Sequence, residues 1–199
     1  SFCGQNDIRL TFHPDQFIVL SSPNETVVQR SIADLAYQAE GSEWVNADVI
    51  NVHAGGTYGD KESALRRLED VIQGLPSMIR SRLTLENDDR SYTPRDLLPF
   101  CKRLSIPFVY DVHHHRCLPD GLIEEEVTHR AIATWNREPL FHVSSPVEGW
   151  EDANPRSHHD YLDPEDLPND WLDLDITVDI EAKAKEVAIK RLIARLRFN

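Results

Sequence analysis

The stretch Val49-Ile50-Asn51-Val52-His53 is the clearest indication of the fold. It is a short apolar run that ends in a histidine and leads into a helical pattern. Asp60 can cap that helix, in which apolar residues from Ala64 to Ile72 recur at helical spacing. A short run rich in β-branched residues is typical of a strand that is buried on both faces, as in a parallel sheet. The stretch therefore predicts one strand–helix unit.

The same unit recurs along the chain. Five further apolar runs have the length and composition of buried strands, at residues 8–12, 83–85, 107–110, 140–143 and 176–180. Helix starts lie between them, such as Thr93-Pro94-Arg95-Asp96 and Ser22-Pro23-Asn24-Glu25, where a serine cap and a proline at the first helical position are expected. We expect a last helix from about Ala184 to Leu196 and a long irregular insertion at residues 149–169.

This alternation of strands and helices predicts an α/β fold with a parallel sheet. No glycine-rich phosphate loop follows the early strands, which argues against a doubly wound fold and against a nucleotide cofactor. A (β/α)8 barrel, the TIM-barrel type, has eight such units and typically about 250 residues. The six units predict that residues 1–199 form a single domain of this barrel type, which lacks the first two units.

The composition limits the classes of function. The 199 residues are 40% hydrophobic, which suffices for a substantial core, and the formal net charge of -13 excludes a histone-like nucleic-acid coat. No apolar run approaches the length of a membrane span, and the first residues show no secretory signal pattern. Three cysteines without metal-finger spacing favour a reducing compartment. We expect a monomer in the cytoplasm with no membrane partner.

Each predicted strand ends in a residue that can bind a metal ion: His13, His53, Glu86, Asp111, His142 and Glu181. His114 follows Asp111 by three residues. In a parallel barrel the carboxyl ends of the strands meet at one face, where the active site lies. A lone histidine is usually an ordinary hydrogen-bonded residue, and a lone carboxylate after a strand is often a helix cap. Six coincidences at one structural position nevertheless favour a metal site.

Imidazole and carboxylate ligands without thiolate suit Mn²⁺, Zn²⁺ or Fe²⁺ better than Ca²⁺, and their number predicts more than one ion. A cluster of two or three such ions suits the hydrolysis of a phosphodiester. The spacing leaves two choices open. Only one residue of His113-His114-His115 is expected to bind a metal directly, and one of the pair His158-His159 is a further candidate. Lys183 is either a plain surface charge or a contact to a phosphate.

Several strings of residues resemble the UV damage endonucleases. They are TFHPDQF (11–17), VHAGGTYGDK (52–61), LENDD (85–89), YDVHHH (110–115), HVSS (142–145), HHDY (158–161) and EAKAKE (181–186). The resemblance runs in order over essentially the whole chain, and the ENDD and DVHHH strings at this spacing are highly specific. Members of this family are TIM barrels, related to xylose isomerase and endonuclease IV, that nick DNA immediately 5′ of cyclobutane dimers and 6-4 photoproducts.

The resemblance implies two or three bound divalent ions, with Mn²⁺ favoured and Zn²⁺ or Mg²⁺ as alternatives. It selects His114 from the triple histidine and His158 from the pair, and it implies eight metal ligands: His13, His53, Glu86, Asp111, His114, His142, His158 and Glu181. Five residues are expected to be catalytic, namely Glu86, Asp111, His114, Glu181 and Lys183. The family also has two strand units before the one that ends at His13, and they supply another metal histidine.

The resemblance further implies which residues meet double-stranded DNA. Gln16 and Phe17 are expected to form a wedge at the lesion, because a planar amide and an aromatic ring can fill the gap that unstacked bases leave. The alternative is that Phe17 begins a buried apolar run. Tyr58, Lys61 and Lys183 are expected to contact the DNA.

The leading prediction is therefore a metal-dependent DNA repair endonuclease that works at the nucleoid, in the cytoplasm, on UV-damaged double-stranded DNA. Three alternatives stay open: an abasic-site nuclease like endonuclease IV, a metal-dependent sugar isomerase on the same barrel, and a non-catalytic remnant that binds DNA or metal. Cleavage of lesion-bearing DNA, aldose–ketose turnover and binding without cleavage distinguish these functions.

Overall fold

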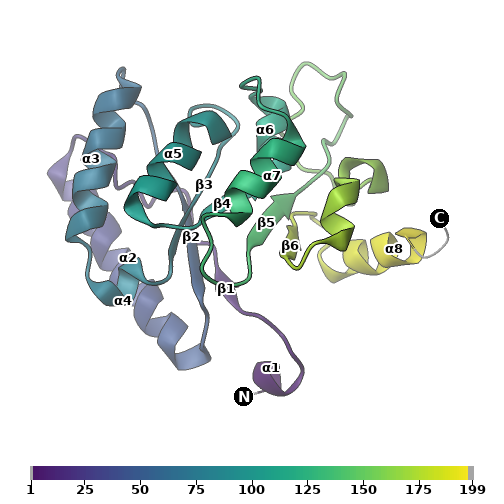
Figure 1. The fold of residues 1–199 in the computed structure, drawn as a ribbon, viewed down its shortest axis with the longest axis horizontal. Helices are drawn as coiled ribbons and strands as arrows, with labels where there is room; N and C mark the ends of the chain where they lie inside the picture. Colours follow the sequence, from purple (N-terminus) through teal and green to yellow (C-terminus); the bar gives the residue numbers. More distant parts are fainter. Residues whose placement is uncertain (1, 197–199) are drawn as a thin grey trace. The chain divides into compact units, whose positions relative to one another are not determined.

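The computed structural model describes residues 2–196 (Figure 1). These residues form two compact units. The first unit comprises residues 2–86 and 99–108, and the second comprises residues 87–98 and 109–196. The chain passes between the units after Glu86, within α5 (Pro94–Leu104) and after Phe108. Strands and helices alternate in both units, as the sequence predicts. That residues 1–199 form a single domain stays a prediction.

The first unit holds three parallel strands in the order β1 (Thr11–Phe12), β2 (Val49–His53) and β3 (Leu83–Glu86). Its helices are α1 (Phe2–Gln5), α2 (Glu25–Val45), α3 (Lys61–Gly74) and α4 (Ser77–Arg80). The register pairs His53 with Glu86, so the carboxyl ends of β2 and β3 are level with each other.

The second unit continues with β4 (Phe108–Asp111), β5 (Leu140–Val143) and β6 (Thr177–Ile180), again parallel and in chain order. Its helices are α6 (Val112–Cys117), α7 (Glu124–Ile132) and α8 (Glu186–Leu196), with the short 3-10 helices η1 (Pro164–Asp166) and η2 (Asn169–Asp173) before β6. The register pairs Asp111, the last residue of β4, with His142, the last but one of β5, so two of the predicted metal ligands lie level on neighbouring strands.

The strands β2 to β5 are buried on both faces, apart from the half-buried His53, and this burial explains their nearly continuous apolar runs. Burying a Val, Leu or Ile side chain contributes about 1.5–3 kcal/mol to the free energy of unfolding. A polar side chain at such a position costs free energy unless a hydrogen bond compensates it. The polar residues Asn51 and Thr84, which are 1% and 0% exposed, therefore need an explanation.

The six strands lie where the sequence predicts them, although β1 has only two of the five residues expected. The predicted serine cap at residue 22 is wrong. The cap of α2 is Asn24, whose Oδ1 accepts a hydrogen bond from the N–H of Thr26 at 2.9 Å. Ser22 Oγ instead accepts from the N–H of Asn24 at 3.1 Å, so the proline between them lies before the helix. An asparagine in extended conformation caps as well as a serine.

The other helix predictions agree with the structure more closely. Asp60 caps α3, and α5 begins at Pro94. The last helix begins at Glu186, two residues later than expected, because Lys185 has a φ of 51°, which a right-handed helix cannot include. Residues 149–169 are irregular apart from η1 and the first residue of η2. No helix within residues 2–196 has the length and apolar character that crossing a membrane requires.

Candidate metal centre

In the first unit, three predicted metal ligands meet at the carboxyl ends of the strands. Glu86, the last residue of β3, has no exposed surface. Its Oε2 lies 3.2 Å from Nε2 of His13, which follows β1, and 4.0 Å from Nε2 of His53, which ends β2. The rings of the two histidines are 5.5 Å apart. The structure thus brings His13, His53 and Glu86 together, as the strand-end pattern predicts.

A backbone carbonyl sets the orientation of the His13 ring. Nδ1 of His13 lies 3.1 Å from the carbonyl oxygen of Asn51 and donates to it. The proton is then on Nδ1, and Nε2 is the ring nitrogen that faces the Glu86 carboxylate. Histidines that bind metals are commonly held in this way, with the second ring nitrogen bonded to a carbonyl or carboxylate.

In the second unit, the carboxylate of Glu181 faces two histidines. Its Oε1 lies 3.2 Å from Nδ1 of His142, and its Oε2 lies 3.4 Å from Nδ1 of His158. His142 is 1% exposed and pairs with Asp111 in the register of β4 and β5. His158 comes from the long irregular insertion. A residue far from any strand end is therefore part of this set.

Asp111 and His114 form the other half of the set in the second unit. Asp111 caps α6, because its Oδ1 accepts from the N–H of His114 at 2.7 Å. Nδ1 of His114 donates to the carbonyl oxygen of Asn87 at 3.0 Å, which leaves Nε2 available as a ligand atom. The Asn87 side chain in turn bonds both the N–H and the C=O of Asp111, at 3.0 and 2.8 Å.

The other two histidines of the triple have structural partners. Nδ1 of His113 bonds the carbonyl of Ser144 at 3.1 Å, and His115 bonds the hydroxyl of Tyr110 at 2.8 Å and the carboxylate of Asp120 at 3.1 Å. In the pair that follows, Nδ1 of His159 accepts from the N–H of Tyr161 at 2.9 Å. Of these two groups, His114 and His158 are the residues that face the other predicted ligands, which is the choice that the resemblance implies.

Burial lowers the pKa of His158 from its usual value, although the neighbouring carboxylates of Glu181 and Asp111 act in the opposite direction. Burial also lowers the pKa of His113, whose ring lies 5.0 Å from that of His158. A lowered pKa keeps an imidazole neutral at pH 7. The neutral ring is the form that binds a metal ion, so burial favours the protonation state of His158 that metal binding needs.

The spacing of the donor atoms fits metal binding. Ligand atoms about 2.1 Å from one ion lie roughly 3.0–3.4 Å apart at octahedral or tetrahedral angles. The separation of 3.2 Å between His13 and Glu86, and those of 3.2 and 3.4 Å around Glu181, fall in this range. The separation of 4.0 Å between His53 and Glu86 lies outside it. These imidazole and carboxylate pairs could each contribute ligands to a divalent ion, with a donor chemistry that suits Mn²⁺ or Zn²⁺.

Comparison with known proteins identifies the chain. A family model described as UV-endonuclease UvdE matches residues 1–199, which is the whole sequence. The chain belongs to the UvdE family. The UV DNA damage endonuclease of Bacillus velezensis is 40% identical over 203 residues, which cover 96% of this chain and 62% of the relative. That of Bacillus pumilus is 35% identical over 204 residues, which cover 96% of this chain and 63% of the relative. The chain thus spans less than two thirds of these relatives.

Solved structures agree with this family assignment and confirm the predicted fold class. The crystal structure of SacUVDE matches 98% of this chain with a TM-score of 0.90 and 29% identity, and the match covers 68% of that chain. Endonuclease IV from Thermus thermophilus matches 98% of this chain and 78% of its own, with a TM-score of 0.70 and 16% identity. The second likeness shows the fold alone, which is the TIM-barrel type of α/β fold.

The residues that the UvdE resemblance assigns to DNA lie at the surface. Phe17 is 77% exposed, so the alternative that it begins a buried run is wrong, and Gln16 beside it is also exposed. Tyr58 is 48% exposed and has a φ of 51°, while Lys61 is the first residue of α3. Lys183 is exposed, and its backbone N–H donates to the carbonyl of His159 at 3.2 Å.

Three polar residues that support these ligands were not predicted as functional from the sequence. Asn87 holds Asp111 and His114, as described above. Asn51 holds His13 through its carbonyl, and its amide bonds Glu86 at 2.5 Å; Thr84 bonds Asn51 at 2.9 Å. Each is buried, and a polar residue inside a strand that is buried on both faces is the signal that could have revealed Asn51 and Thr84.

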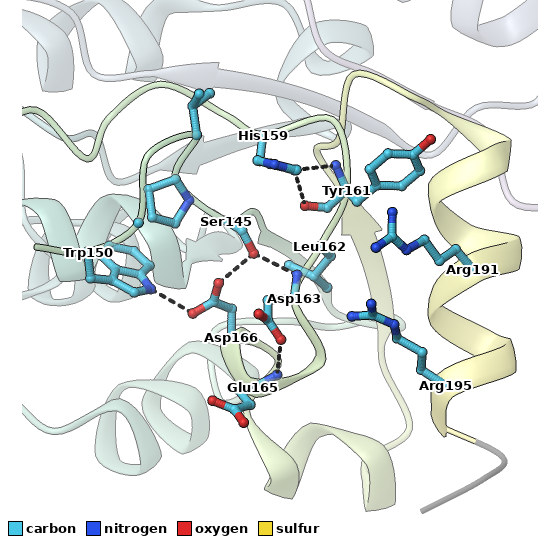
Figure 2. Close-up of a pocket in the computed structure, with 13 residues that line it drawn as sticks. Ser145, Trp150, His159, Tyr161, Leu162, Asp163, Glu165, Asp166, Arg191 and Arg195 are labelled. Atoms are coloured by element: carbon cyan, nitrogen blue, oxygen red, sulfur yellow. Dashed lines mark hydrogen bonds between the residues drawn. The ribbon is translucent and has the colours of Figure 1, made fainter. Parts of the chain in front are cut away.

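A cavity of about 310 Å³ lies in the second unit, beside the insertion that carries His158 (Figure 2). Charged side chains line it on two sides, with Asp163, Glu165 and Asp166 around η1 and with Arg191 and Arg195 on α8. The guanidinium of Arg191 lies over the ring of Tyr161, 4.3 Å from its centre.

Asp166 anchors the insertion at this cavity. Its carboxylate accepts hydrogen bonds from the hydroxyl of Ser145 at 2.5 Å and from the indole N–H of Trp150 at 2.7 Å (Figure 2). The guanidinium of Arg116 lies 3.6 Å from the same carboxylate. Asp166 thereby ties the end of the insertion to its beginning, and His158 lies on the segment between these two points.

Replacing Asp166 by alanine should lower the free energy of unfolding by about 2–3 kcal/mol, because a buried hydroxyl, an indole N–H and a guanidinium lose their acceptor. Urea denaturation measures this loss. The matched control is Glu165→Ala, which removes an exposed carboxylate one residue away and should change stability by less than about 0.5 kcal/mol. Equal stabilities of the two variants would contradict the anchoring role of Asp166.

Proposed function

We propose that this chain nicks double-stranded DNA immediately 5′ of UV photoproducts, both cyclobutane dimers and 6-4 photoproducts, as a metal-dependent endonuclease. The match of the UvdE family over residues 1–199 is the observation that carries the proposal. The relatives of 40% and 35% identity are named UV DNA damage endonucleases, which supports this substrate. A monomer in the cytoplasm that associates with the nucleoid remains the expectation for its state and place.

The proposed metal ligands are the eight residues at and near the strand ends: His13, His53, Glu86, Asp111, His114, His142, His158 and Glu181. Two or three divalent ions, with Mn²⁺ favoured, would polarise the phosphodiester and generate a nucleophile from water at neutral pH. The buried carboxylates of Glu86 and Asp111 supply negative charge, and the oriented imidazoles supply neutral nitrogen ligands. Attack of water oxygen on phosphorus breaks the P–O3′ bond, which leaves a 3′-hydroxyl and a 5′-phosphate.

The remaining proposed site residues would bind the DNA. Lys183 follows Glu181 closely, so its ammonium can neutralise charge on a phosphate near that carboxylate. Gln16 and Phe17, both exposed, would probe the damaged base pairs as a wedge, with Tyr58 and Lys61 as further contacts. A crosslinked dipyrimidine stacks and pairs poorly, so its deformation costs less free energy than that of intact DNA. This difference would give the selectivity for lesions.

The decisive experiment is a nicking assay on a duplex with one cyclobutane dimer, with Mn²⁺, beside an undamaged duplex and a duplex with an abasic site. We expect one cut 5′ of the dimer, its loss on chelation of the metal, and a fall of at least about 10²-fold in Glu86→Gln, which removes a charged ligand. In the unsubstituted chain, Mn²⁺ added after chelation should restore the cut.

Two results would contradict this proposal. Preferential cutting of the abasic duplex would show a nuclease like endonuclease IV, and Mn²⁺ binding without any nicking would show a non-catalytic remnant. Sugar isomerisation is tested in parallel by aldose–ketose turnover, which we expect to be absent. The likeness to endonuclease IV at 16% identity concerns the fold and favours neither alternative.

Phe17→Ala should reduce lesion cleavage by roughly 10-fold or more at subsaturating DNA, because an aromatic contact to an unstacked base contributes about 1–3 kcal/mol. The ring is 77% exposed, so the substitution should leave the thermal midpoint unchanged. Trp44→Ala is the matched control, since this ring on α2 is 75% exposed and has no proposed role in DNA binding. If both variants cleave the dimer like the unsubstituted chain, Phe17 is no part of the wedge.

A further inference from the structure

Two buried polar residues form a hydrogen-bonded chain that ends at the Glu86 carboxylate. Asn51 in β2 and Thr84 in β3 are partners in the parallel register and are 1% and 0% exposed. The hydroxyl of Thr84 donates to Oδ1 of Asn51 at 2.9 Å, and Nδ2 of Asn51 donates to Oε2 of Glu86 at 2.5 Å. Hydrogen bonds to a carboxylate are roughly twice as strong as those between neutral groups.

The order of donors along this chain allows only one orientation of the Asn51 amide. A carboxylate accepts and cannot donate, so the NH₂ group must face Glu86. The amide oxygen then faces Thr84, whose hydroxyl can supply the matching proton. A flipped amide would set oxygen against the carboxylate and lose the bond to Glu86, although the Thr84 hydroxyl could still accept from the NH₂ group. The carboxylate therefore decides the orientation of the Asn51 amide, and the hydroxyl of Thr84 supports it by donating to the amide oxygen.

Asn51 also orients the second ligand of this set. Its backbone carbonyl accepts from Nδ1 of His13 at 3.1 Å, while Nε2 of the same ring lies 3.2 Å from the Glu86 oxygen that the Asn51 amide bonds. One residue thus acts on an imidazole through its main chain and on a carboxylate through its side chain. The two ligand atoms are held at a separation that suits a common ion.

We propose that Asn51, held by Thr84, is a positioning residue for metal binding by His13 and Glu86. The inference rests on the proposed function only for the identity of these two ligands. Residues that orient metal ligands typically change metal affinity or activity by about 10–100-fold when they are lost. A purely structural role would alter the stability of the fold and leave the metal affinity of the folded protein unchanged.

The experiment measures Mn²⁺ affinity of the folded protein, from the electron paramagnetic resonance signal of free Mn²⁺, and the urea midpoint of each variant. Asn51→Leu keeps the approximate size, adds no charge and cannot donate to Glu86, so it should weaken Mn²⁺ binding by about 10–100-fold. Thr84→Val keeps the branched shape and removes the donor, so it should weaken binding by roughly 10-fold. Thr84→Ser keeps the hydroxyl and should rescue the affinity that valine loses.

The matched control is Thr128→Val in α7, which removes a buried hydroxyl that accepts from the indole N–H of Trp171 at 2.9 Å. It should lower the urea midpoint and leave the Mn²⁺ affinity as it is. The valine and serine variants at Thr84 differ by one hydroxyl, so affinity that follows the hydroxyl supports the proposal even where both midpoints fall.

The outcomes separate this proposal from the proposed function. If Asn51→Leu and Thr84→Val bind Mn²⁺ within twofold of the unsubstituted chain, the positioning role is wrong, whether or not the chain nicks damaged DNA. If the unsubstituted chain binds Mn²⁺ and these variants bind it weakly, but no dimer is nicked, the positioning role stands and the proposed function fails.

Discussion

The buried carboxylate of Glu86, at the end of β3, determines how the polar side chains of the first unit are arranged. A buried negative charge is costly unless it is paired, hydrogen-bonded or bound to a metal ion. The Asn51 amide and the His13 and His53 rings gather around it. The second unit repeats this arrangement, since Asp111 is buried at the end of β4 and Glu181 faces His142 and His158.

Parallel strands supply this arrangement without any local motif. Because the register sets His53 level with Glu86 and Asp111 level with His142, ligands that are tens of residues apart in sequence become neighbours. Backbone carbonyls then orient the rings by accepting a hydrogen bond from Nδ1. The carbonyl of Asn51 does so for His13, and that of Asn87 for His114. Under the proposed function, divalent ions held by these groups would promote the hydrolysis of a phosphodiester.

The sequence predicts the strands and their terminal residues well, because apolar runs with polar ends carry both signals at once. It fails where the deciding interaction is not periodic. Ser22 and Asn24 are equally good caps, and only the backbone conformation selects the second. His158 lies on an irregular segment, so its selection as a candidate ligand came from the resemblance and not from the spacing. In the sequence, Asn51 and Thr84 look like ordinary members of apolar strands. Their hydrogen bonds to each other and to Glu86 depend on a strand register that a single sequence does not contain.

The most direct test of metal binding at these carboxylates is anomalous X-ray diffraction at the manganese absorption edge, from crystals of this chain grown with Mn²⁺. We expect anomalous peaks within coordination distance of the Glu86 and Glu181 carboxylates, at about 2.0–2.3 Å from histidine nitrogens and carboxylate oxygens. Absence of a peak at both carboxylates, at a Mn²⁺ concentration that supports cleavage of dimer-containing DNA in solution, would contradict this expectation.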